Sequence, residues 1–331
     1  MSSLKLAIDI GTTKTSVFQV GAGVILCEPS LVSVSGGGKK TSYEIGLDAK
    51  RMLGKSAIST TVISPVSEGE IRDLSAAKIM LEKFLSKIEV NRFTRVEVCA
   101  TVPCGTEKAA ISRFKELFSA CGINNVNFIE SPIAAAVGAG APISESAPCF
   151  IIDMGGGVTN IAAVSLDGVI AGVSANLGGN LIDGMIIDSI EDRKSLRIGS
   201  QTAEQIKCEI GSLLPGDTMP MVISGMDISS GAPRSVRITA ADVYEPIRYF
   251  VNKIYEISSM LLAKLPPEVS AEIRNTGIYL GGGLSRIVGL EEYFYNEFSL
   301  AVNVTEDPEF VSVLGAGKIM QNDKVYKKLR I

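Results

Sequence analysis

The sequence predicts an α/β protein built from two related halves. Three observations support this prediction. Apolar strands alternate with amphipathic helices along the whole chain, which is typical of α/β folds. A ten-residue string near the N-terminus recurs near the middle of the chain, as expected for a duplicated domain. The length of 331 residues also favours two domains.

The first half begins with an apolar strand over residues 4–10, a Gly-Thr-Thr turn and a β-branched strand over 15–20. The Gly-rich stretch 35–40 predicts a loop. Apolar residues at helical spacing predict helices over 73–88 and 106–121. Strands are expected at 96–102 and 128–130, and Pro132 favours the start of an alanine-rich helix that reaches about Gly138.

The second half repeats this opening. Strands are expected at 149–153 and 158–164, followed by a hairpin turn at 167–168. Helices are expected near 181–192, 202–212, 242–264 and 289–297, and a strand at 278–280 precedes a second glycine cluster.

Composition excludes several function classes. The net charge of −4 gives no basic face, so we expect no nucleic-acid partner. The chain has no histidine, which excludes histidine-ligated zinc and Ser-His-Asp triads. Its six cysteines lack metal-binding spacing and are expected to be buried, reduced thiols of a cytoplasmic protein. Neither a signal peptide nor a run of 18 apolar residues is present.

The internal repeat predicts a phosphate site. Residues 8–17 and 152–161 share the pattern I-D-x-G-[T/G]-[T/G]-x-T-x-[V/I]. Asp9 and Asp153 each end a buried strand, where an unpaired carboxylate is costly. The glycines and threonines that follow offer N–H and hydroxyl donors to phosphate oxygens. Two such turns face to face would clamp a nucleoside triphosphate, with both aspartates holding Mg²⁺ largely through water. The alternative is a pair of ordinary hairpin turns kept from an old duplication.

A third glycine run, over residues 279–285, leaves a strand and precedes a helix. At such a junction of an α/β fold a ligand can approach the backbone closely. The run is neither G-x-G-x-x-G nor a Walker A loop, and a plain turn is the alternative.

In order along the chain, these strings resemble the MreB family of bacterial actins, within the superfamily of actin, sugar kinases and heat-shock chaperone ATPases. The resemblance covers essentially the whole chain. It rests on residues 8–17, 28–30, 128–138, 152–157, 202–211, 224–228, 266–268, 279–285 and 315–317.

The resemblance implies an actin-like fold of two α/β domains, each a five-stranded mixed sheet with flanking helices. Two small inserted subdomains complete the nucleotide cleft. It implies a first half over 1–145 with an insertion at about 33–66. The second half would cover 146–331, with an insertion at about 178–244 and a final helix, 315–331, packed on the first half. By position, ATP would contact Gly11, Thr12, Thr13, Lys14, Gly155, Gly156, Gly157, Thr159, Glu204, Lys207, Gly282 and Gly283. Lys14 would add charge near phosphate or remain a solvated turn lysine.

Three departures from the family pattern bear on activity. Ser131 replaces the glutamate that orders the attacking water, and Glu130 stands one position early. A serine hydroxyl cannot act as a base at neutral pH, so we expect at most weak ATP hydrolysis, unless Glu130 takes the role. The stretch 178–183 keeps only Asp183 of a more acidic string, and Leu284 replaces a glycine.

The resemblance also raises membrane contact. Family members bind membranes through an N-terminal amphipathic helix or a hydrophobic loop, and here the first strand starts too early for the helix. The matching loop, 90–95, has one aromatic residue, Phe93, and two arginines. Repetition along a filament could make so weak a contact sufficient. A plain surface loop is the alternative. The basic residues of 324–330 could attract anionic lipid or form a solvated end.

The expected function is that of a nucleotide-switched cytoskeletal protein. It would form homopolymer filaments, act with cell-wall elongation proteins and work in the cytoplasm, with possible membrane association. A small-molecule kinase is one alternative, although the chain shows no extra catalytic site. A monomeric chaperone-like or scaffold ATPase is another, although heat-shock chaperones carry a peptide-binding domain after the ATPase region and we expect none here.

Overall fold

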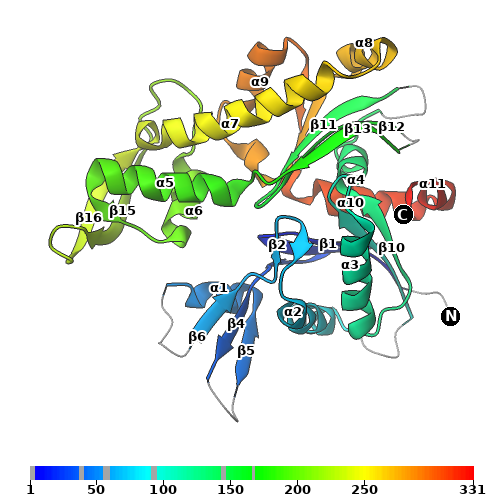
Figure 1. Ribbon diagram of the computed structural model, residues 1–331, viewed down its shortest axis with the longest axis horizontal. Coiled ribbons are helices and arrows are strands. Elements are labelled where there is room, and N and C mark those ends of the chain that lie inside the picture. The colour runs from blue at the N-terminus through cyan, green and yellow to red at the C-terminus, as the bar shows by residue number, and fades with distance from the viewer. Residues whose placement is uncertain (1–3, 37–40, 55–59, 91–94, 143–146, 166–167) are drawn as a thin grey trace.

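Two five-stranded sheets form the framework of the protein in a computed structural model of the chain (Figure 1). The structure describes residues 4–36, 41–54, 60–90, 95–142, 147–165 and 168–331. Three sequence predictions fall on other residues. Phe93 and the hairpin residue Asp167 lie outside these ranges, and so do residues 37–40 of the expected loop at 35–40.

The first sheet has β1 at its centre. This strand pairs in parallel with β9 and antiparallel with β2, because the turn after β1 is a tight hairpin, whereas β9 is reached through a long crossover. The order of its strands is β10 (Val126–Glu130), β9 (Val96–Val102), β1 (Leu4–Ile10), β2 (Lys14–Gln19) and β3 (Gly23–Pro29).

The second sheet repeats this arrangement around β11. It pairs antiparallel with β12 and parallel with β17. The order of its strands is β13 (Gly168–Ala175), β12 (Thr159–Ser165), β11 (Cys149–Met154), β17 (Ile278–Gly281) and β18 (Val302–Val304).

The registers confirm that the repeated string adopts the same structure twice. In the first hairpin Asp9 lies opposite Ser16, and in the second Asp153 lies opposite Asn160. The duplicated sequence therefore places an aspartate at the same point of each sheet. The expected five-stranded mixed sheets are confirmed as well.

Two helices pack between the sheets, α4 (Ser131–Gly138) and α10 (Val311–Gln321) (Figure 1). Their buried residues share one apolar core with both sheets. The helices cross closely because glycine stands at the crossing: a Cβ on Gly315 would lie 2.6 Å from the carbonyl carbon of Ala134. The string Gly-Ala-Gly at 315–317, one of those that carry the resemblance, thus allows the halves to pack against each other.

The chain does not form one final helix over 315–331 as expected. Helix α10 starts earlier and ends at Gln321, and α11 (Asp323–Leu329) follows. Asn322 separates them because its side chain accepts from the N–H of Val325 and so begins a new helix. Tyr326 and Leu329 of α11 are buried in the core between the sheets.

The outer helices cover the remaining faces of the sheets. Asp73 precedes α2 and caps it, since its side chain accepts from the N–H of Ala76 at 2.9 Å. These helices are α2 (Leu74–Lys87) and α3 (Lys108–Ala120) in the first half, and α5 (Gly179–Lys194), α7 (Ala240–Leu262), α8 (Pro267–Thr276) and α9 (Leu290–Phe298) in the second. In the part of the chain that the structure describes, no helix combines the length and apolar character needed to cross a membrane.

Smaller elements lie at the end of the molecule away from α4 and α10 (Figure 1). One group comprises β4 (Val32–Ser35), β5 (Ser42–Ile45), α1 (Gly46–Met52) and β6 (Thr60–Ile63), followed by the hairpin β7 (Val66–Ser67) and β8 (Glu70–Ile71). The other comprises β14 (Leu196–Arg197), α6 (Ser200–Ile210), β15 (Pro220–Asp227) and β16 (Pro233–Thr239). Two 3-10 turns, η1 (Gly283–Arg286) and η2 (Pro308–Phe310), follow strands of the second sheet.

Candidate nucleotide site

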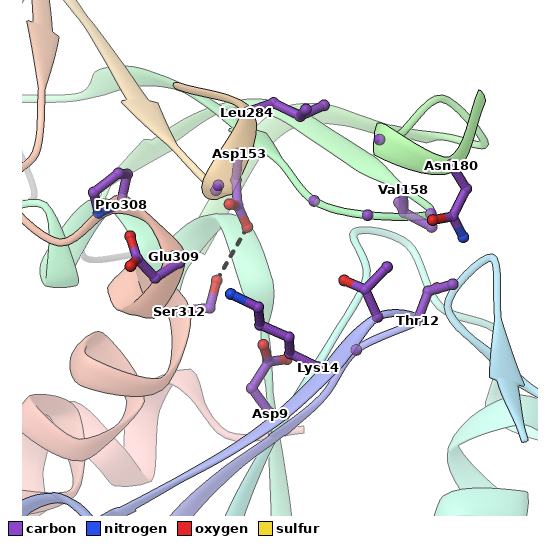
Figure 2. A pocket seen from close by; sticks show the side chains of 18 of the residues that line it. Asp9, Thr12, Lys14, Asp153, Val158, Asn180, Leu284, Pro308, Glu309 and Ser312 are labelled. Carbon is purple, nitrogen blue, oxygen red and sulfur yellow. Dashed lines mark hydrogen bonds between the residues drawn. The ribbon is translucent and has the colours of Figure 1, made fainter. Parts of the chain in front are cut away.

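A cavity of about 370 Å³ lies between the two halves. Both repeated hairpins reach it, together with η1, η2 and α6. Figure 2 shows side chains from the two hairpins on opposite sides of this space. Of the predicted site residues, it is lined by Asp9, Gly11, Thr12, Thr13, Lys14, Ser131, Asp153, Gly155, Gly156, Gly157, Glu204, Lys207, Gly282 and Gly283.

The two glycine turns have the same internal geometry. The N–H of Gly11 donates to the carbonyl of Lys14 at 3.0 Å, and the N–H of Gly155 donates to that of Val158 at 2.9 Å. Each turn therefore reverses the chain directly after its aspartate.

The turns also touch each other across the interface. A Cβ on Gly156 would lie 2.8 Å from Cβ of Thr13, and one on Gly157 would lie 2.8 Å from Cβ of Thr12. Real Cβ atoms do not come so close, so residues 156 and 157 must be glycine for this approach. The sequence pattern G-G-G opposite G-T-T is thus a packing requirement as well as a source of donors.

Both aspartates are held by a hydroxyl from a neighbouring element. Thr101 at the end of β9 donates to Oδ1 of Asp9 at 2.6 Å, and Ser312 of α10 donates to Oδ2 of Asp153 at 3.0 Å (Figure 2). Burial raises the pKa of Asp9, against the effect of the Thr101 hydrogen bond. Burial and the nearby charge of Asp9 raise the pKa of Asp153 to about 7.

Two desolvated carboxylates that repel each other are suited to a divalent cation. Mg²⁺ is commonly bound by one or two carboxylates, with waters and phosphate oxygens completing an octahedron. Asp9 and Asp153, beside turns that can bind a triphosphate, offer that set of donors. When bound there, the ion would neutralise charge on the phosphates. The residues therefore fit the predicted magnesium site.

Lys14 extends into the cavity from the hairpin that carries Asp9. Figure 2 shows its amino group directed toward Ser312 and Asp153. On the same side of the cavity Arg286 donates to Oε2 of Glu309 through Nε at 3.0 Å and Nη2 at 2.8 Å. Burial alone would raise the pKa of Glu309. Hydrogen bonds and the charges of Arg286 and Lys14 outweigh it and lower that pKa. A lysine so placed is a point charge for phosphate oxygens.

Helix α6 forms another wall through Glu204 and Lys207. These residues are three apart and therefore share one helix face. The ammonium of Lys207 lies 2.7 Å from Oδ1 of Asp183 and donates to the carbonyl of Gly179 at 3.0 Å. Glu204 forms an ion pair with Lys50 at 2.6 Å. Both side chains line the cavity as expected, but each is already engaged by a protein group.

The third glycine run approaches the backbone of the second hairpin. Gly282 has φ +78 and its N–H donates to the carbonyl of Pro308 at 2.8 Å. A Cβ at this position would lie 2.7 Å from the backbone nitrogen of Met154. Leu284, which replaces a family glycine, has its side chain at the cavity wall (Figure 2).

The structure does not bring Glu130 and Thr159 into the cavity. Glu130 is the last residue of β10, and its carboxylate accepts from the N–H of Gly105 at 2.8 Å. Ser131, the first residue of α4, faces the cavity instead and is buried. Thr159 is fully buried and donates to the carbonyl of Leu177 at 2.7 Å. Neighbouring residues at a strand end point in different directions, so Ser131 lines the cavity and Glu130 does not.

Several cavity residues were not predicted as site residues. Asn160 lies opposite Asp153, hydrogen-bonds to it and accepts from the N–H of Cys104 at 3.1 Å. The cross-strand spacing of the repeat could have identified Asn160, since Ser16 stands at the same place in the first hairpin. No local pattern in the sequence could have identified the other four, because they reach the site from distant segments of the chain. These residues are Thr101, Ser312, Arg286 and Glu309.

The duplicated sheets with facing glycine turns and paired aspartates define an actin-like protein. A family model described as MreB/Mbl protein matches residues 3–328. The chain belongs to the MreB/Mbl family.

Known proteins agree with this assignment. The cell shape-determining protein MreB of Escherichia coli strain K12 is 33% identical over 327 residues, which cover 97% of this chain and 94% of that protein. Solved structures of MreB5 of Spiroplasma citri bound to ADP and to AMPPNP each have a TM-score of 0.92, with identities of 27% and 28% and 99% coverage of both chains. A double helical filament of MamK has the same fold, with a TM-score of 0.79 at 21% identity, and covers 97% of this chain and 99% of that chain. The predicted family and the predicted actin-like fold are confirmed.

Proposed function

We propose that this chain binds ATP with Mg²⁺ between its two halves and assembles into filaments that organise cell shape and cell-wall synthesis. One observation carries the proposal: two aspartate-glycine hairpins meet across a 370 Å³ cavity with Lys14 between them. The similar MreB5 structures are of a protein bound to ADP or AMPPNP. Among similar proteins, MreB of E. coli is named for cell shape and MamK was solved as a filament.

We also propose that the chain consists of two halves that meet at about residue 145, with small subdomains at about 33–66 and 178–244. Each sheet has its own apolar core, and a third core between the sheets contains α4 and α10. This arrangement supports two bodies that turn about α4 and α10, so that nucleotide at their interface would set their relative orientation.

High-speed sedimentation across protein concentration, with and without Mg-ATP, tests the proposal. We expect a pellet above a critical concentration with Mg-ATP, and filaments by negative-stain microscopy. A Gly157→Val variant, whose side chain would collide with Thr12, should bind no ATP and remain in the supernatant. Wild-type protein that binds ATP yet stays monomeric would contradict the filament function and favour a scaffold or chaperone-like ATPase.

Hydrolysis is proposed to be slow. Ser131 occupies the place from which a glutamate would act, and Glu130 is turned toward Gly105. A hydroxyl can hold a water but does not accept its proton at neutral pH. The filaments would then persist longer than those of a protein with an intact base.

We also propose that the protein works in the cytoplasm, with peripheral membrane contact through the loop that carries Phe93. Burial of one phenylalanine contributes about 2 kcal/mol, which is weak for a monomer and sufficient when repeated along a filament. Co-sedimentation with anionic vesicles should require both Mg-ATP and Phe93, and a Phe93→Ser variant that still co-sediments would exclude this contact.

A further inference from the structure

Helix α1 of the first half touches α6 of the second half at the open end of the cleft. The two helices lie at the opposite end of the interface from α4 and α10 (Figure 1). Helix α1 packs on β3, β4, β5 and β6, whereas α6 packs on α5 and β15. Any contact between α1 and α6 therefore joins two separate bodies at the point where their separation would be greatest.

Two side chains of α6 hold the C-terminal end of α1. Glu204 forms an ion pair with Lys50, whose Nζ lies 2.6 Å from Oε2. Nε2 of Gln201 donates to the backbone carbonyl of Lys50. That carbonyl lies in the last turn of α1 and also accepts from the N–H of Leu53 at 3.1 Å. The second half thus supplies a second donor to the same carbonyl at the end of a helix of the first half.

The other end of α1 is fixed to the first sheet. The N–H of Leu47 donates to Oε2 of Glu28 at 3.0 Å, and the other oxygen of Glu28 pairs with Lys87 of α2. Glu28 lies in β3, which pairs with the hairpin strand β2. Glu28 therefore connects α1 to the sheet that carries Asp9.

The charges of this contact continue to the cavity wall. Negative and positive side chains alternate from the second half to the first, in the order Asp183, Lys207, Glu204 and Lys50. The charges of Glu204 and Lys50 act on Asp183 together with that of Lys207, which places all four groups within electrostatic reach. Glu204 lines the cavity and also pairs with Lys50. Its carboxylate therefore lies both at the proposed nucleotide site and in the contact between α1 and α6.

We propose that Lys50, Gln201 and Glu204 form a latch that closes the nucleotide cleft and slows the release of bound nucleotide. The latch rests on the proposed ATP binding. Its two bonds are independent, because Glu204 uses the side chain of Lys50 whereas Gln201 uses its backbone. The side chains of Lys50 and Glu204 are each 35% exposed, and the hydrogen bond from Gln201 is part-buried. Bonds with such access to solvent are weak enough to open and reclose.

The rate of nucleotide release tests the latch. Purified full-length protein is loaded with etheno-ATP and Mg²⁺, and release is followed after addition of excess ATP. We expect Lys50→Met to speed release about 5-fold and Gln201→Ala about 3-fold, from the usual strength of such bonds. In a Glu204→Gln background, Lys50→Met should change the rate by less than about 2-fold, since its partner has lost its charge.

Arg51→Met is the matched control. Arg51 stands next to Lys50 on α1 but pairs with Asp48 of the same helix, so release should keep the wild-type rate. Melting temperatures of all variants within a few degrees of wild type would show that a faster rate is not unfolding. Unchanged release in both Lys50→Met and Gln201→Ala would overturn the latch while leaving ATP binding intact. Failure of the wild-type protein to bind etheno-ATP or ATP would instead overturn the proposed function.

Discussion

Gly156 of the second half packs directly against Thr13 of the first half. The space between them cannot hold a side chain on residue 156, because a Cβ there would lie 2.8 Å from Cβ of Thr13. The same relationship joins Gly157 and Thr12. The two halves of the site are thus fitted to each other as well as to a ligand.

Gly156→Ala should lower stability by about 1–3 kcal/mol, the usual cost of overpacking, and weaken ATP binding. Differential scanning fluorimetry and ATP titration would measure both. Thr13→Gly removes the opposing side chain, so the double variant should recover much of the lost melting temperature. Gly184→Ala on α5 is the control, because nothing lies within 4 Å of the added carbon. A Gly156→Ala protein as stable as wild type would show that the turns do not meet in solution.

The buried Asp153 should make the ligand-free protein more stable as pH falls. Its pKa rises from 3.8 in the unfolded chain to about 7 in the folded one, so the folded state binds more protons between these values. Stability is therefore lowest above pH 7 and increases as pH falls from about 7 toward 4. Asp9 and Asp183, whose pKa values are also raised by burial, act in the same direction.

Melting temperatures between pH 8 and 5.5, without nucleotide or Mg²⁺, would measure this effect. Above pH 7 Asp153→Asn should be more stable than wild type, because it has no charge to bury. Its dependence on pH should also be shallower. An equal slope in both proteins would show that Asp153 does not titrate in this range.

Lys207→Met should destabilise the fold even without nucleotide. The side chains of Lys207 and Asp183 are only 9% and 11% exposed, so the variant leaves a buried carboxylate without its cation. Loss of one partner of such a pair costs about 3–5 kcal/mol. Urea denaturation would measure the change, and Lys207→Met with Asp183→Asn should recover part of it. If the single variant folds normally and fails only to bind ATP, the ammonium acts on the nucleotide and not on Asp183.

Ser131→Glu should raise phosphate release from filaments by about 100-fold, the lower end of the range for a positioned general base. The side chain would start from the first residue of α4, where the helix N-terminus favours a carboxylate. Ser131→Gln has the same size without the charge and should stay slow. A Glu variant no faster than the Gln variant would locate the deficit elsewhere.

Local patterns were sufficient for the α/β class and for the two related halves, whereas the actin-like arrangement of the sheets was expected from the resemblance to the MreB family. The spacing of apolar residues predicted the central strands of both large sheets and most of the helices, and the repeated string predicted two hairpins with paired aspartates. The edge strands β3, β13 and β18 and the short strands outside these two sheets were not predicted. Boundaries at 315–331 were wrong because the break between α10 and α11 depends on one capping side chain, Asn322. Glu130 and Thr159 were misplaced for a related reason, since the direction of a side chain at a strand end depends on neighbouring elements.

The sequence by itself determined that this protein has two like halves, each with an aspartate and a glycine turn at a strand end. Periodicity and repetition are properties of the chain, so they can be read without coordinates. Only the tertiary structure decided which groups complete the site. Lys50 and Glu204 are 154 residues apart, and Ser312 and Asp153 are 159 apart. No local pattern encodes such pairs, because they form only when the packing of α4 and α10 brings the two sheets together.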